Sequence, residues 1–252
     1  MKFYHLLFII ITLSCSNSST KDINTIIINY DKTCNYPLSN FITNCNIVKL
    51  ETSDSILTGD ISDIEFHENN IIILDKKNNT VQVFNQKGEF IHQLSNLGRG
   101  PGEYLYLNDI ATNSQGIYLL DYTQQKILHY DYDWKFQKDL YFPFYVSEIN
   151  CIHDKMMLYT ERNGEKEDYQ FYLADSCGKI INRYLPRNNN FGNNTFITSN
   201  VFTQNNNSFI FAPRFNNTLY TLHDTIATPI YTLNFRDKTF PEERTNITKY
   251  DI

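Results

Sequence analysis

Three acidic side chains recur at one position of a repeated sequence pattern. The three tripeptides are Ser62-Asp63-Ile64, Asn108-Asp109-Ile110 and Ser147-Glu148-Ile149. Hard cations prefer several oxygen ligands, so Asp63, Asp109 and Glu148, if brought to one place, would form a Ca²⁺ site or receive a cationic group. The alternative is that each acid accepts backbone N–H groups where a strand begins.

A glycine-rich segment is the second candidate site. Residues 98–104 read Gly-Arg-Gly-Pro-Gly-Glu-Tyr, with glycines at Gly98, Gly100 and Gly102. Glycine lets a backbone turn sharply and approach a ligand closely. The guanidinium of Arg99 suits carboxylates, sulfates or phosphates. Glu103 lies four residues after Arg99, so two interpretations stay open: ligand contact, or an Arg99–Glu103 ion pair that fixes a junction.

The other polar residues favour structure over catalysis. Asp75 and Asp121 each end an apolar run just before a turn, which predicts turn-capping hydrogen bonds. No Ser/His/Asp triad, metal signature or phosphate loop is visible in the sequence. The histidines after the leader fall at unrelated positions of the repeat: His67, His92, His129, His153 and His223.

The segments that carry these residues repeat every 46 residues. Residues 61–94 align with residues 107–140 without a gap, which matches Asp63 with Asp109 and Asp75 with Asp121. A period in the forties indicates a propeller blade or a helical solenoid. Short β-branched and aromatic runs alternate with turn sequences, and no run keeps a full helical period. We therefore predict an all-β fold, a β-propeller of four-stranded antiparallel blades.

The repeat places four blades near residues 59–95, 105–141, 145–185 and 195–235. The first strand of blade one is expected over residues 59–66, and that of blade four over residues 195–202. Residues 47–252 then form a partial propeller, and residues 16–46 a tether and lead-in.

Residues 1–15 resemble a bacterial lipoprotein leader. Lys2 precedes an apolar run over residues 6–11, and Leu13-Ser14-Cys15 resembles a lipobox, although Thr12 stands where leucine is usual. Cys15 would be lipidated and would anchor the protein to a membrane without spanning it. This predicts an exported envelope protein, an outer-membrane lipoprotein that faces the periplasm or the surface. A plain secretory signal is the alternative.

Charge and cysteine content restrict the partners. Without residues 1–14 the chain has 21 basic and 28 acidic side chains, a net charge of −7. This balance argues against a nucleic-acid partner, since phosphate binding relies on basic surface.

Export would place Cys34, Cys45, Cys151 and Cys177 in an oxidising compartment, where Cys34–Cys45 and Cys151–Cys177 are the sequence-local pairings. Isolated buried thiols are the alternative.

The glycine-rich segment, with the strand-like runs that follow it to residue 138, resembles an NHL repeat. Residues 45–235 are similar to the exported six-bladed β-propeller lipoproteins of Bacteroides-type bacteria. The resemblance implies that Ile47-Val48-Lys49-Leu50-Glu51 is a lead-in strand. In closed propellers such a strand completes the last blade. Against six blades the chain is about two short, through C-terminal truncation or because another chain supplies the rest.

We therefore expect a membrane-anchored propeller that binds or scaffolds a protein or glycan partner. The alternatives are a calcium-dependent hydrolase or lyase that uses Asp63, Asp109 and Glu148, and a non-functional remnant. A fold of this kind hosts many functions, so the sequence gives no ligand.

Overall fold

Runs of β-branched and aromatic residues form the strands of this chain, as their alternating pattern predicts. The computed structural model describes residues 23–29, 31, 35–160, 169–187, 200–205, 208–214 and 216–238. The predicted leader with Cys15, and also Cys34, lie outside the described residues. The described elements are strands and two short 3₁₀ turns, η1 (Leu38–Asn40) and η2 (Arg236–Lys238).

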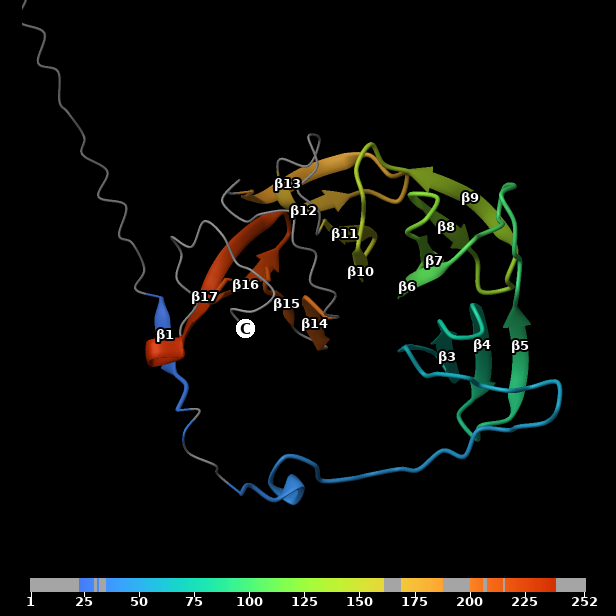
Figure 1. Ribbon diagram of the computed structural model, residues 1–252, viewed down its shortest axis with the longest axis horizontal. Helices are drawn as coiled ribbons and strands as arrows, with labels where there is room; N and C mark the ends of the chain where they lie inside the picture. Colours follow the sequence, from blue (N-terminus) through green and yellow to red (C-terminus); the bar gives the residue numbers. More distant parts are fainter. Residues whose placement is uncertain are drawn as a thin grey trace, which may run out of the picture.

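Four antiparallel sheets follow one another along the chain and form an arc around an open centre (Figure 1). Blade one contains β2 (Asp63–His67), β3 (Asn70–Asp75), β4 (Thr80–Asn85) and β5 (Phe90–Leu94). Blade two contains β6 (Leu107–Asn113), β7 (Gly116–Asp121), β8 (Lys126–Tyr130) and β9 (Phe136–Tyr141). Blade three contains β10 (Glu148–Ile152), β11 (Lys155–Tyr159), β12 (Tyr169–Ala174) and β13 (Ile180–Pro186).

Blade four contains β14 (Phe202–Asn205), β15 (Ser208–Phe211), β16 (Thr218–His223) and β17 (Ile226–Asn234). The predicted all-β propeller of four-stranded antiparallel blades is confirmed. Two strand boundaries were wrong. In blade one the first strand begins at Asp63 instead of residue 59, and in blade four it is β14 instead of residues 195–202, of which 195–199 lie outside the described part.

The hydrophobic core lies between neighbouring blades. Three clusters of buried side chains join blade one to two, two to three and three to four. In the first, Ile72, Leu74 and Val83 of blade one contact Ile110 and Leu119 of blade two. Successive side chains of a strand point to opposite faces, so each inner blade contributes to two clusters. The arc is therefore stabilised by sheet faces packed against each other.

Buried carboxylates cap the turn after the second strand of blades one and two. Asp75 accepts backbone N–H groups from Gly59 at 2.6 Å and Asn78 at 3.0 Å. Asp121, 46 residues later, accepts from Leu105 at 2.7 Å and Gln124 at 3.0 Å. Both aspartates are fully buried. The predicted turn-capping role is confirmed, and each aspartate also fixes the segment that leads into its blade.

The lead-in does not form the predicted strand. Residues 47–51 have no strand; the N–H of Glu51 donates to Gly88 O at 2.7 Å, and its carboxylate accepts from Phe90 N at 2.9 Å. The segment therefore packs on blade one. The strand that joins blade four is β1 (Asn24–Ile27), which pairs parallel with β17. The described parts of the lead-in run along the open side of the arc, from β1 towards blade one (Figure 1).

The described cysteines are not paired with one another. Cys45 and Cys177 are exposed free thiols, and Cys151 is a buried one. The Cys151–Cys177 pairing was wrong, because both thiols are free; the alternative of an isolated buried thiol holds for Cys151. Within the described residues, no helix has the length and apolar character that crossing a bilayer requires.

Candidate functional site

The glycine-rich loop, residues 98–104, connects β5 of blade one to β6 of blade two. Its ends are held by Gly98 N donating to Tyr104 O at 2.9 Å and by Tyr104 N donating to Asn96 O at 2.9 Å. Gly102 has a φ of +72°, and a Cβ there would lie 2.8 Å from the ring of Phe136. A side chain at this position would therefore clash with blade two in an already disfavoured backbone conformation.

Glu103 closes the loop on its own backbone. Its carboxylate accepts the N–H of Gly100 at 2.8 Å and lies where a Cβ on Gly98 would collide with it. Arg99 is exposed, and among the described residues no ion pair joins it to Glu103. The predicted Arg99–Glu103 pair was wrong, because the carboxylate is used for a local backbone contact. The loop does fix a blade junction, by other bonds.

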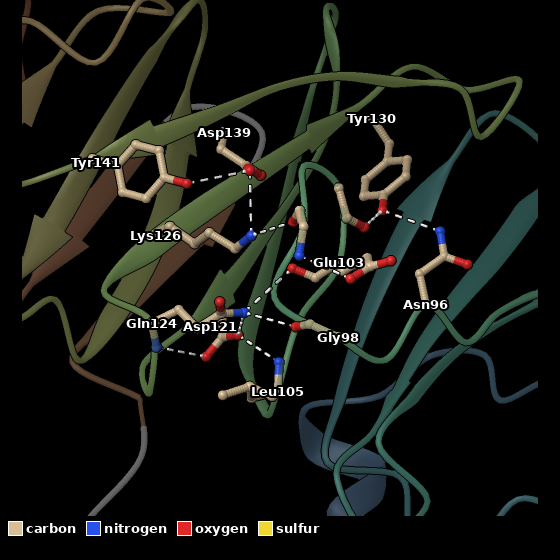
Figure 2. A network of polar contacts seen from close by, with 12 residues as sticks. Asn96, Gly98, Glu103, Leu105, Asp121, Gln124, Lys126, Tyr130, Asp139 and Tyr141 are labelled. Carbon is tan, nitrogen blue, oxygen red and sulfur yellow. Dashed lines mark hydrogen bonds and ion pairs between the residues drawn. The ribbon is translucent and has the colours of Figure 1, made fainter.

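A buried lysine anchors the loop to blade two. Lys126 of β8 donates to Gly100 O at 3.2 Å and to the carboxylate of Asp139 in β9, also at 3.2 Å (Figure 2). The side chains of Lys126 and Asp139 are 1% and 8% exposed. The second carboxylate oxygen of Asp139 has no hydrogen-bond partner among the described residues. Two nearly desolvated charges therefore depend on each other.

Two buried tyrosines join the loop to the blades. The hydroxyl of Tyr104 donates to Leu94 O at 3.2 Å and Asn79 O at 3.1 Å, both in blade one. The hydroxyl of Tyr130 donates to Gly102 O, and Asn96 reaches the same hydroxyl at 3.4 Å (Figure 2). Burial raises the pKa of Tyr104 to about 12. Both phenols therefore stay neutral donors at physiological pH.

Two of the three predicted acids bond to the next blade. Asp109 accepts the N–H of Ile149 in blade three at 2.7 Å, and Glu148 accepts the N–H of Val201 in blade four at 3.0 Å. Asp63 instead accepts the N–H of Ile64, its own neighbour, at 2.8 Å. All three acids thus accept backbone N–H groups at the start of a strand.

The three acids are close enough to influence one another. Burial raises the pKa of Asp109 well above its ordinary value, and the charges of Asp63 and Glu148 raise it further. Glu148 is also paired with Arg214 at 2.6 Å. Within the described part of the chain, no group of three or more His, Cys, Asp or Glu side chains is arranged to hold a metal ion. The described geometry therefore shows an inter-blade bonding role for Asp109 and Glu148.

A third polar centre, which was not predicted from the sequence, lies at the junction of blades one and two. Glu65 of β2 accepts the hydroxyl of Thr112 in β6 at 2.9 Å. Burial raises the pKa of Glu65 to about 7, the bond from Thr112 opposes this rise, and Asp63 adds to it. Tyr132 lies beside this centre, stacked on His67 with ring centroids 3.4 Å apart. Glu65 aligns with Ala111 in the repeat. The one sequence signal for this centre was therefore a glutamate at a position where blade two has a small apolar residue.

Three histidines pack against aromatic rings. His67 stacks on Tyr132, His92 on Trp134 and His129 on Tyr118. Burial lowers the pKa of His92 and His129. His92 and His129 therefore favour their neutral form, and all three rings contribute to the packing of the blades.

Replacing Lys126 with methionine tests the anchor of the loop. Lys126→Met leaves Asp139 as an uncompensated buried charge, so we expect the free energy of unfolding to fall by about 3–5 kcal/mol. Lys135→Met, which removes an exposed ion pair with Asp133, is the matched control and changes it by less than about 1 kcal/mol. Denaturant unfolding measures both. Adding Asp139→Leu to Lys126→Met should recover stability; equal stability of the two single variants would contradict the anchoring role.

The raised pKa of Glu65 predicts a pH dependence of stability. Its value is about 7 in the folded state against 4.5 ordinarily, so the folded state binds the extra proton between these values. The stabilisation is complete below about pH 4.5 and is lost as pH rises to about 7. Relative to Glu65→Gln, the wild type should lose up to roughly 1.4 kcal/mol per pH unit in this range.

Chemical unfolding at several pH values measures this difference. The comparison with Glu65→Gln is needed because the lowered pKa values of His92 and His129 act in the opposite direction. Glu68→Gln, at a mostly exposed turn position, is the control and should follow the wild type. Parallel curves for wild type and Glu65→Gln would contradict the prediction.

The comparisons with known proteins agree with the observed fold. A protein from Bacteroides fragilis, described as a candidate exported protein, has a crystal structure that matches with a TM-score of 0.64 at 26% identity. The match covers 75% of this chain and 55% of that chain, so this chain spans about half the length of that relative. Among proteins with curated descriptions, none matches the chain in sequence.

Two other solved structures match with lower scores. BamB from Moraxella catarrhalis matches at 11% identity over 68% of this chain and 47% of its own, with a TM-score of 0.45. An inactive virginiamycin B lyase from Staphylococcus aureus, solved with quinupristin, matches at 13% identity over 70% and 56%, with a TM-score of 0.48. The family model described as "Domain of unknown function (DUF4934)" matches residues 22–252. The chain therefore belongs to the DUF4934 family.

Proposed function

We propose that this protein is an exported β-propeller that binds a protein partner and acts as a scaffold, not as an enzyme. The apolar surface of blade one carries the proposal. Ile64 and Phe66, on one face of β2, are 41% and 71% exposed, and Leu57 and Ile61 just before them are also exposed. Contiguous exposed apolar surface on a soluble domain marks an interaction site.

The polar residues of the described chain support binding more than chemistry. Glu103 and Lys126 hold the loop, Asp109 and Glu148 bond to the next blade, and Asp121 caps a turn. A catalytic group must reach its substrate in the right protonation state. Groups fixed between packed sheets suit a rigid scaffold instead. Of the residues predicted for ligand contact, Arg99 keeps an exposed side chain.

The proposed location is the cell envelope, with a lipid anchor at Cys15. The Bacteroides fragilis relative is described as a candidate exported protein, which supports export. The apolar run over residues 6–11 followed by Leu13-Ser14-Cys15 supports lipidation. A lipid anchor would hold the propeller at a membrane surface, where its free face is available to envelope proteins.

Metabolic labelling tests the anchor. A palmitate analogue should label the wild type and leave Cys15→Ala unlabelled, because the lipobox cysteine is the acceptor. Cys45→Ala removes another exposed thiol and should keep the label. Equal labelling of all three proteins, or of none, would leave a plain secretory signal as the better interpretation.

Photo-crosslinking in intact cells tests the binding role. A benzoyl-phenylalanine at Phe66 should give an intermolecular product, because this side chain lies on the exposed face of blade one. The same group at Tyr141, which is 67% exposed on the outer strand of blade two, should give none. A product at both positions, or at neither, would contradict a specific partner site on blade one.

A further inference from the structure

The free face of blade one is the counterpart of a face that is buried elsewhere in the arc. Moving 46 residues along the chain matches Ile64 with Ile110, Ile71 with Ile117, Ile73 with Leu119 and Phe84 with Tyr130. In blade two these four residues are buried in the cluster that packs on blade one. The same positions of blade one therefore form a surface suited to the face of a preceding blade.

Among the described residues, the segment that precedes β2, residues 47–58, covers the outer half of this surface. Thr58 donates to the side chain of Gln82 at 2.6 Å, and Gln82 donates to Leu57 O at 3.2 Å, so residues 57–58 lie over β4. Ile73 and Phe84 are buried. The inner half, formed by β2 and the beginning of β3, stays open, with Ile64 and Phe66 exposed and Ile71 half-buried.

The backbone N–H at the start of β2 has an acceptor within blade one. At the junctions of blades two with three and three with four, a carboxylate of the preceding blade accepts an N–H at the start of the next inner strand. Ile64 aligns with Ile149, whose N–H is bound by Asp109. In blade one, Asp63 accepts the N–H of Ile64 from within the same strand. In blade one, Asp63 therefore takes the role that a carboxylate of the preceding blade has at the other two junctions.

Building on the proposed function, we propose that the inner half of this face docks an aliphatic sheet face of a different polypeptide. That sheet would pack on the apolar side chains of Ile64, Phe66 and Ile71. The partner is a β-blade because each of the three junctions within the arc joins one sheet face to another.

A second copy of this chain is a poorer occupant. The face of blade four that points away from blade three carries Ile210 and Leu219, but also Thr221 and Thr228, which follow from the pairing of β15, β16 and β17. In blades one to three, the face that packs on the following blade is mostly aliphatic or aromatic. Packing threonines against Ile64 and Phe66 buries less apolar area, and apolar area is the main source of affinity at such a junction.

The crosslinked product at residue 66 identifies the occupant. Mass spectrometry of the adduct should place the crosslink in another polypeptide, in a segment with alternating apolar residues. In the same cells Ile64→Lys should lower the yield at least about tenfold, because it puts a charge where an isoleucine would be buried. Gln137→Lys, in β9 on the outer edge of blade two, is the control and should leave the yield unchanged.

The outcomes separate this inference from the proposed function. An adduct with a second copy, supported by self-association of the purified mature chain that Ile64→Lys removes, overturns the choice of partner but keeps the scaffold. An adduct in a helical or unstructured segment overturns the docking of a blade. Absence of any adduct overturns both. The thermal unfolding of Ile64→Lys should match the wild type, since this side chain is already exposed; Ile64→Ala serves as a second variant if it does not.

Discussion

At the junctions of blades two with three and three with four, the start of the inner strand finds its hydrogen-bond acceptor in the preceding blade. A backbone N–H buried at the edge of a sheet is costly without a partner. Asp109 meets this need for Ile149, and Glu148 meets it for Val201. These two bonds fix the height of one blade relative to the next, and the apolar clusters then fill the space between the sheets.

The junction of blades one and two holds charged and titratable groups that water does not reach well. Lys126 and Asp139 compensate each other, and the lysine also binds the backbone of the glycine-rich loop. Burial raises the pKa of Glu65 to about 7, and no basic side chain of the described residues forms an ion pair with it. A charge that is paired stabilises one loop conformation, whereas an unpaired carboxyl makes its junction sensitive to pH. The junction of blades one and two therefore contains a buried ion pair, Lys126–Asp139, and also a buried carboxyl, Glu65, whose pKa is raised.

The fold could be predicted from the sequence because it rests on local patterns repeated at a fixed spacing. Alternation along β3 and β4, together with the 46-residue match, determined which residues face a neighbour. The caps at Asp75 and Asp121 followed from their place before a turn. The Lys126–Asp139 pair could not be found in this way, because its counterparts in blade one are Thr80 and Gln93, and only the pairing of β8 with β9 brings the charges together.

The lead-in shows where pattern alone is insufficient. Residues 24–27 and 47–50 are both short apolar runs, and either could extend a sheet edge. Which of the two runs pairs with a sheet depends on which sheet edge the run can reach and on the other contacts that hold it elsewhere. Glu51 binds the turn between β4 and β5, which holds the second run on blade one, and β1 is left to pair with β17. The lead-in thus adds a strand to blade four and covers half of a face on blade one. In the described part of the chain the inner half of that face remains exposed, and this is the surface on which we propose that a partner docks.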